Sequence, residues 1–213
     1  LDALTGAVQS VLDVHDALRS VFDSAARVLE VLPVGAVSAA HVVTRVDISG
    51  LDDPSAVMVA ATEEAYAALD PGSGELVRVV FFDPGPGVQG RVLLAVHHLV
   101  VDGVSWRILV PDLAEAVAGT APLRSGTPLR VWARGLLEAA PARRSELPLW
   151  RRITAPDGRA AFASRPVDPT RDTMSATAQA HVDVPVAVTE ALLTTVPEKS
   201  PAGVDDALLT ALA

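Results

Sequence analysis

The chain of 213 residues lacks cysteine, contains a single lysine and has no long apolar run. The lack of cysteine excludes a disulfide framework and gives no sign of an oxidising compartment. The apolar runs fall well short of the ~20 residues that span a bilayer, and no signal-peptide pattern is present. A net charge of −9 argues against nucleic acid as a partner. We therefore expect a cytoplasmic protein that binds neither membrane nor nucleic acid.

One stretch, residues 97–106, combines the side chains that carry chemistry: His-His-Leu-Val-Val-Asp-Gly-Val-Ser-Trp. The apolar run before it is typical of a buried strand, and the Asp-Gly pair within it predicts a turn that leads into a helix. Because side chains alternate across a strand, we expect His97 and His98 to point to opposite faces, with only one of them in a cleft. An imidazole, whose ordinary pKa is ~6.5, is a candidate general base near neutral pH.

Two other interpretations of this stretch stay open on spacing alone. The Asp-Gly pair is also compatible with an ordinary turn beside two core histidines. Histidine and aspartate are also common metal ligands, so a metal site formed by His97, His98 and Asp102 is the second interpretation. We expect no metal site, because neighbours on opposite faces of a strand cannot easily share one ion and no cysteine is available to help.

The stretch resembles the signature of the condensation-domain superfamily of nonribosomal peptide synthetases, which has the chloramphenicol-acetyltransferase fold. Residues 14–22, Val-His-Asp-Ala-Leu-Arg-Ser-Val-Phe, resemble the early helix motif of that superfamily. Residues 128–134, Pro-Leu-Arg-Val-Trp-Ala-Arg, resemble the segment with a tryptophan that follows the histidine motif. The resemblance implies an α/β, chloramphenicol-acetyltransferase-like sandwich, of which the chain is the N-terminal half and the start of the second half.

Three further segments resemble the epimerization branch of the superfamily. Residues 206–213, Asp-Ala-Leu-Leu-Thr-Ala-Leu-Ala, are similar to the motif Asp-x-Leu-Leu-x-Ala-x-Gly, with Ala213 in place of the glycine. Residues 146–150 and 189–197 also look like epimerization-domain segments. The resemblance implies conversion of L to D configuration at the Cα of a carrier-bound aminoacyl or peptidyl thioester. An amide-forming condensation domain and an inactive scaffold that docks carrier proteins are the alternatives.

The family resemblance also assigns roles to the residues of the histidine motif. It makes His98 the catalytic residue, which exchanges the Cα proton together with a glutamate from the second half of the domain. It makes Asp102 structural, tying the turn by a salt bridge, and Gly103 the residue that lets the backbone approach the cleft. The supporting motif residues are His97, Asp102, Gly103, Ser105 and Trp106.

The resemblance implies no cofactor of the chain's own. The substrate would arrive on the phosphopantetheine arm of a peptidyl carrier protein, with neighbouring synthetase domains in the same chain. Residues 124–171 hold ten arginines and four acidic residues, a local excess of six positive charges. Solvated surface is the simpler interpretation of this excess. The sharper one is an electrostatic guide for an acidic carrier or for the phosphate of its arm.

The domain organisation expected from the sequence has three parts. Residues 1–152 would be the N-terminal subdomain, 153–174 a loop or linker rich in proline, and 175–213 the truncated start of the C-terminal subdomain. Leu1 is not an initiator methionine, and the chain stops inside a predicted helix without a stop signal. We therefore expect a fragment whose partner glutamate lies beyond its end and which is inactive alone.

Hydrophobic periodicity predicts alternating helices and strands. The expected elements, in chain order, are a helix over 4–22, strands over 26–32 and 41–48, a helix over 54–69, a hairpin of 77–82 with 91–96, the helix after the histidine motif, and a strand over 175–184. Pro111 falls within the motif helix and predicts a bend after Arg107. Residues 85–90 match a dinucleotide-binding fingerprint, but a strand follows them and prolines flank them, so we expect a hairpin turn.

Overall fold

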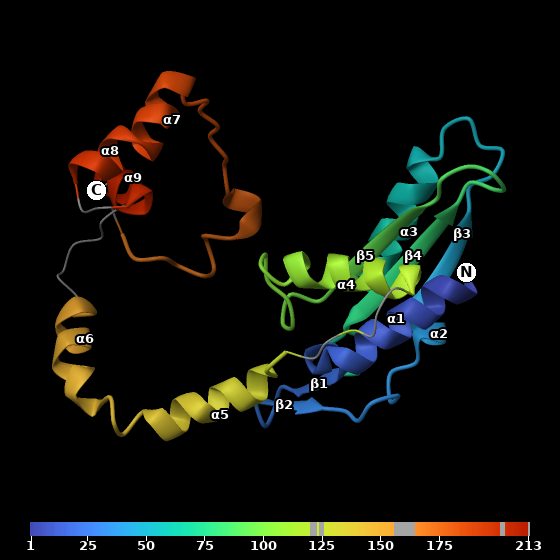
Figure 1. The fold of residues 1–213 in the computed structure, drawn as a ribbon, viewed down its shortest axis with the longest axis horizontal. Helices are drawn as coiled ribbons and strands as arrows, with labels where there is room; N and C mark the ends of the chain where they lie inside the picture. Colours follow the sequence, from blue (N-terminus) through green and yellow to red (C-terminus); the bar gives the residue numbers. More distant parts are fainter. Residues whose placement is uncertain (120–122, 124–125, 156–164, 201–202, 213) are drawn as a thin grey trace. The chain divides into compact units, whose positions relative to one another are not determined.

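The computed structural model describes residues 1–119, 123, 126–155, 165–200 and 203–212 (Figure 1). Its internal contacts divide the chain into two compact units, Leu1–Arg143 and Arg144–Ala213. The predicted subdomain boundary at residue 152 and the predicted linker over 153–174 stay predictions.

The first unit contains two sheets together with 3₁₀ and α-helices. Its elements are α1 (Asp2–Val14), the 3₁₀ helix η1 (Asp16–Arg19), β1 (Ser20–Asp23), β2 (Val28–Val31), α2 (Ala39–Val42), β3 (Val43–Asp47), α3 (Ser55–Ala67), β4 (Val77–Asp83), β5 (Arg91–Val96), α4 (Trp106–Ala118) and α5 (Leu129–Ala139). Strands β1 and β2 form an antiparallel pair. The larger sheet has the order β3-β4-β5.

The three-stranded sheet is mixed, with its central strand β4 buried. Strand β3 runs parallel to β4, with Val43 opposite Val79, and β5 runs antiparallel to β4, with Leu94 opposite Val79. A parallel pair needs a long crossover connection, and α3 lies in the segment between β3 and β4. The antiparallel pair β4–β5 confirms the predicted hairpin. Strand β5 itself, at the edge of the sheet, is only partly buried, so the expectation of a buried strand before the histidines is wrong.

The core has two layers, one on each face of this sheet. Val79, fully buried, belongs to a cluster with Leu12 of α1 and Leu109 of α4. The next residue, Val80, belongs to a second cluster that includes Ala65 of α3. Because successive side chains of a strand point to opposite faces, α1 and α4 cover one face of the sheet and α3 covers the other (Figure 1).

Several of the predicted elements are confirmed. The strands over 26–32 and 41–48 and the helix over 54–69 correspond to β2, β3 and α3. Residues 85–90 lie in the connection between β4 and β5, as a hairpin turn predicts. Gly85 and Gly87 have φ of +94° and +78° there, which glycine adopts without strain.

The prediction of one helix over residues 4–22 is wrong. Helix α1 ends at Val14, His15 has an extended backbone, and Phe22 lies in β1 opposite Leu29 of β2. The pairing of β1 with β2 and the burial of the residues just before β1 override the helical periodicity.

The predicted strand over 175–184 is also wrong. The segment begins in a short 3₁₀ helix, η3 (Met174–Ala176), and continues without regular structure up to α7. Alternation makes a strand only where a neighbouring strand supplies hydrogen bonds, and none pairs with this segment in the part of the chain that the structure describes.

Helix α4 contains Pro111 and is nevertheless continuous from Trp106 to Ala118. The predicted bend after Arg107 does not break the helix into two. Pro111 has no N–H to donate to the Arg107 carbonyl, so the helix lacks one internal hydrogen bond at this point.

The second unit is helical. Its elements are η2 (Arg144–Glu146), α6 (Leu147–Ile153), η3, α7 (Val186–Leu193), α8 (Thr195–Lys199) and α9 (Val204–Leu212), and the last three helices contact one another. Among the described residues of the whole chain, no helix has the length and hydrophobicity to cross a bilayer.

Candidate functional site

The two histidines of the motif lie just beyond the end of β5. The strand ends at Val96, and the backbone N–H of His97 donates to the Leu76 carbonyl at 2.8 Å. His98 begins a turn that is closed by the Val100 N–H donating to the His97 carbonyl at 3.1 Å. Neither histidine is a strand residue, so the expectation that strand alternation sends them to opposite faces is wrong in its premise.

His97 is half-buried and held by its own turn. Its Nδ1 accepts a hydrogen bond from the Leu99 backbone N–H at 3.1 Å. The ring also lies near Asp70, whose pKa is held below its ordinary value mainly by the Gly72 N–H and, to the smallest degree, by His97. These contacts are those of a residue that stiffens the turn.

His98 is exposed, and its imidazole forms no hydrogen bond or ion pair with any of the described residues. A ring without internal partners keeps both nitrogens available for an incoming molecule. The structure thus leaves His98 able to accept a proton, which is what a general base requires.

Asp102 ties the turn through Ser105. Its Oδ1 accepts hydrogen bonds from the Ser105 N–H at 2.8 Å and the Ser105 hydroxyl at 2.7 Å, and its own N–H donates to Ser105 Oγ at 3.1 Å. The Ser105 hydroxyl and then the Ser105 N–H hold the pKa of Asp102 below its ordinary value. The expected salt bridge is not seen: in the described part of the chain Asp102 has no basic partner, and hydrogen bonds perform the structural role.

The two remaining motif residues, Trp106 and Gly103, differ in their contacts. Trp106 begins α4 and packs against the core cluster of α1 and β4. A Cβ added at Gly103 would meet no atom of the described residues within 4 Å. The close approach of backbone and substrate expected at Gly103 stays a prediction.

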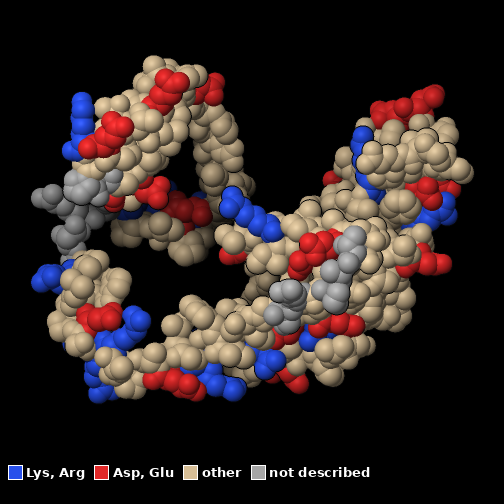
Figure 2. Space-filling model, in the orientation of Figure 1, with Lys and Arg blue, Asp and Glu red and all other residues tan. Residues whose placement is uncertain are grey.

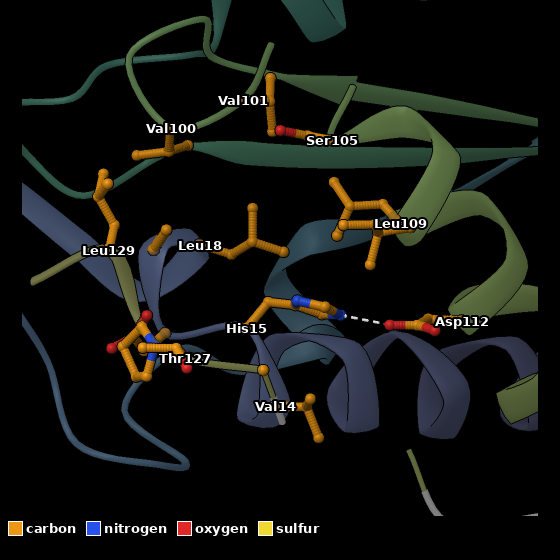
Figure 3. A pocket seen from close by; sticks show the side chains of 15 residues that line it. Val14, His15, Leu18, Val100, Val101, Ser105, Leu109, Asp112, Thr127 and Leu129 are labelled. Atoms are coloured by element: carbon orange, nitrogen blue, oxygen red, sulfur yellow. Dashed lines mark hydrogen bonds and ion pairs between the residues drawn. The ribbon is translucent and has the colours of Figure 1, made fainter. Parts of the chain in front are cut away.

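A cavity of about 370 Å³ lies beside the Asp102–Ser105 turn, the motif turn, and Figure 3 shows the side chains around it. It is formed where the three family-like segments of the first unit meet. Its lining residues are Val14, His15, Asp16, Ala17, Leu18, Val100, Val101, Ser105, Ile108, Leu109, Asp112, Gly126, Thr127, Pro128 and Leu129. A volume of this size is within the range of small-molecule sites. His98 is not among the lining residues.

Two ion pairs stand at this cavity. His15 Nε2 lies 2.7 Å from Asp112 Oδ2, and about a fifth of each side chain is exposed. Asp16 Oδ2 accepts from Arg130 Nε at 2.9 Å. Sequence reasoning missed Asp112, because its partner is 97 positions away and the periodicity placed His15 among the apolar positions of a helix.

Arg19 is a buried charge, with only 5% of its surface exposed. Its Nη1 donates to the carbonyls of Leu12 and Asp13, and its Nε donates to the Leu32 carbonyl at 3.2 Å. The first two carbonyls lie in the last turn of α1 and would otherwise lack partners, and the helix dipole favours a cation there. Arg19 therefore closes the carboxyl end of α1 next to His15.

No cluster of three potential metal-ligating side chains occurs within the described ranges. The histidine motif, as placed here, offers an imidazole and a hydrogen-bonded carboxylate on neighbouring turns. The chemistry available from these residues is proton transfer.

Comparison with known proteins identifies the family. A family model described as "Condensation domain" matches residues 1–213. A linear gramicidin synthase of Brevibacillus parabrevis is 32% identical, with all of this chain aligned to 3% of that protein. Chondramide synthase cmdD of Chondromyces crocatus is 33% identical over 93% of this chain and 5% of that protein.

Solved structures share the fold. The epimerization domain from the third module of tyrocidine synthetase B superposes with a TM-score of 0.64 at 24% identity, over 80% of this chain and 40% of that one. The SgcC5 protein from Streptomyces globisporus gives 0.56 at 24% identity, over 74% and 37%. The chain thus covers a small part of the curated relatives and about two fifths of the related domain. The motif residues, the fold and the match along the whole chain agree: the chain belongs to the condensation-domain superfamily of nonribosomal peptide synthetases, with the chloramphenicol-acetyltransferase-like fold of that family.

Proposed function

We propose that the chain is part of an epimerization domain, which converts the L to the D configuration at the Cα of an aminoacyl or peptidyl thioester. The observation that supports this branch of the family is the segment at residues 206–213, Asp-Ala-Leu-Leu-Thr-Ala-Leu-Ala. The likeness to the solved epimerization domain supports the fold and does not choose between reactions.

The segment has a clear local role in the second unit. Asp206 Oδ2 accepts a hydrogen bond from the Gly203 N–H at 2.8 Å, three residues before it, at the start of α9. This is half of a capping box, which satisfies an otherwise unpaired N–H at the start of a helix. Leu208 and Leu209 are more than half exposed and form an apolar surface on the same helix. Ala213 lies outside the described residues.

The proposed mechanism is proton exchange at the Cα. The thioester carbonyl makes the Cα proton acidic, and the His98 imidazole takes it. The resulting enolate needs hydrogen-bond donors or positive charge near its oxygen. Return of a proton to the opposite face of the Cα, by a second acid-base group, inverts the configuration. No bond other than the C–H bond is broken, so no oxidant or metal is required by the balance of the reaction.

An amide-forming condensation domain is the second candidate. It shares the histidine motif, and His98 would then assist the attack of an amine on a thioester. A third candidate is an inactive scaffold that docks carrier proteins. Two departures support it: Ala213 stands where the epimerization motif has glycine, and Pro111 lies within α4.

We propose a peptidyl carrier protein as the partner, with the substrate on its phosphopantetheine arm. Arg144 of η2 and Arg151 and Arg152 of α6 are exposed. Figure 2 shows several basic side chains, with acidic ones among them, on the face of the region around α6 that it draws. A positive patch attracts an acidic carrier and the phosphate of its arm, and raises the rate of encounter.

The carrier interface is tested by reversing the charge of Arg143 and Arg144 to glutamate in the full-length protein. The affinity for the carrier should fall, and its dependence on salt should weaken, because screened charge attraction is removed. Arg91→Glu, at an exposed arginine of β5, is the matched control. Unchanged affinity throughout a salt titration of the double variant would reject this surface.

The reaction is tested by offering the full-length protein a carrier loaded with an L-aminoacyl thioester in D₂O. Epimerization predicts deuterium at the Cα and D-amino acid after hydrolysis of the thioester. Amide formation with a second loaded carrier, without deuterium uptake, would establish the condensation reaction instead. Binding of the carrier with neither product would leave the scaffold.

A further inference from the structure

The helix that follows the catalytic motif is attached to the molecule at two points on one face. Ser105, the residue just before α4, and Asp112 within α4 are seven residues apart, with Leu109 between them, so the three side chains lie on one face. Leu109 is buried in the core, and Ser105 binds Asp102 in the motif turn. Asp112 binds His15. The motif turn and the Asp112 ion pair are thus connected through two turns of one helix.

His15 is a rigid anchor for this ion pair. Its N–H donates to the Val11 carbonyl at 3.0 Å, and its carbonyl accepts from the Leu18 N–H at 3.0 Å. Arg19 fixes the same end of α1 from inside the core. Because the backbone at His15 is already held on both sides, binding Asp112 has to order only the His15 side chain.

The position of Asp112 matters because Pro111 precedes it. Pro111 leaves the Arg107 carbonyl without its helical partner, so α4 is weakest between the motif turn and Asp112. The bond from Asp112 to His15 attaches the helix at the residue directly after this point. In Figure 3 the dashed bond lies along one side of the cavity, and Ser105 lies at the other.

We propose that His15 and Asp112 are positioning residues. Their ion pair holds α4 against the carboxyl end of α1 and thereby keeps the Asp102–Ser105 turn, and His98 before it, in a fixed place. The effect on catalysis rests on the proposed function, in which His98 is the base. The effect on the turn does not depend on it.

The ion pair between Asp16 and Arg130 provides a matched control. It stands at the same cavity and has a similar length, 2.9 Å against 2.7 Å. It joins η1 to α5 and does not reach α4. Removing it takes away an ion pair of the same region without loosening the motif helix.

The first test measures backbone hydrogen exchange of the motif turn in the full-length protein. The Ser105 N–H, which donates to Asp102, should exchange about tenfold faster in His15→Ala and in Asp112→Ala, with no further gain in the double variant. Arg130→Ala should leave it unchanged. Asp112→Asn keeps the shape of the side chain and one acceptor oxygen, and its Ser105 N–H should exchange at an intermediate rate. This variant decides the test if the alanine variants fold poorly. Unaltered exchange at Ser105 in Asp112→Asn and in the alanine variants would overturn the proposal.

The second test measures turnover of the carrier-bound thioester. We expect kcat to fall about 10- to 100-fold in His15→Ala while KM changes by less than about twofold, because the substrate still binds and the base is misplaced. A rise in KM with kcat unchanged would contradict a positioning role. If the unaltered protein exchanges no Cα proton, the proposed function fails, and the exchange rate at Ser105 still decides the role of the pair.

Discussion

At the scale of single residues, the histidine motif is built from a free imidazole and a fixed turn. His98 has no internal partner among the described residues, while His97 and Asp102 are both hydrogen-bonded to residues close by in sequence. The Asp102 carboxylate is therefore satisfied within the turn, by the Ser105 N–H and hydroxyl. Ser105 takes the place of the salt-bridge partner that the family resemblance implied for Asp102.

The Asp102–Ser105 turn should make stability depend on pH in the acid range. A carboxyl whose pKa is lowered in the folded state stabilises the fold at pH above its unfolded pKa of about 3.9, and this contribution is lost as the pH falls through the lower folded pKa. Asp102→Asn removes the titration. The difference in free energy of unfolding between the two proteins should be constant from about pH 5 to 7 and shrink below about pH 4. A difference that stays constant down to about pH 2 would contradict this role.

Arg19 should be important for stability because its donors serve buried carbonyls. Arg19→Met keeps most of the side-chain volume and leaves the carbonyls of Leu12, Asp13 and Leu32 without this donor. We expect the free energy of unfolding to fall by about 2 kcal/mol or more, measured by denaturant titration. Arg130→Met, at a side chain that is 60% exposed, should cost less than about 1 kcal/mol. Equal losses of unfolding free energy in the two variants would contradict a special role of the buried Arg19 hydrogen bonds.

At the scale of elements, sequence patterns were a good guide where local pattern and tertiary contacts agree. The hairpin of β4 and β5 and the helix α3 follow from alternation, from helical periodicity and from the Pro-Gly turn between strands. The end of α1 did not follow, because His15 binds Asp112 across 97 positions and Arg19 turns into the core. The 175–184 segment shows the converse: its alternation lacks a pairing strand in the described part of the chain.

The same limit applies to the candidate site. The motif itself, and the turn within it, could be found from the residues alone. The cavity behind it, and the convergence of residues 14–22 with 128–134 beside it, depend on contacts between segments more than 80 positions apart. No local pattern carries that information.

The hairpin of β4 and β5 should be sensitive to a single added methyl group. A Cβ at Gly90 would lie 2.5 Å from the Phe81 ring and 3.0 Å from the Phe82 carbonyl oxygen. Gly90→Ala should therefore lower the free energy of unfolding by about 1–3 kcal/mol. Gly135→Ala, within α5 and with no atom within 4 Å of the added Cβ, should be neutral or stabilising by up to about 1 kcal/mol. A neutral Gly90→Ala would show that the Phe81 ring moves aside freely.

At the scale of the whole molecule, the three-stranded sheet places the proposed base, His98, just beyond the end of its edge strand β5. Strand β5 delivers His97 and His98 at its carboxyl end, and α4 packs on α1 over one face of the sheet. The backbone before His98 is fixed by the pairing of β5 with β4, while the His98 imidazole itself is exposed. The family membership and this placement together make His98 the group on which the proposed reaction depends.

The most direct measurement is the rate at which the Cα proton of a carrier-bound aminoacyl thioester exchanges with D₂O in the full-length protein and in its His98→Ala variant. We predict enzymatic exchange that falls at least about 100-fold in His98→Ala, since a positioned general base contributes about that much. His41→Ala, at an exposed histidine of α2, should exchange at the unaltered rate. Exchange that persists undiminished in His98→Ala would contradict the assignment of the base.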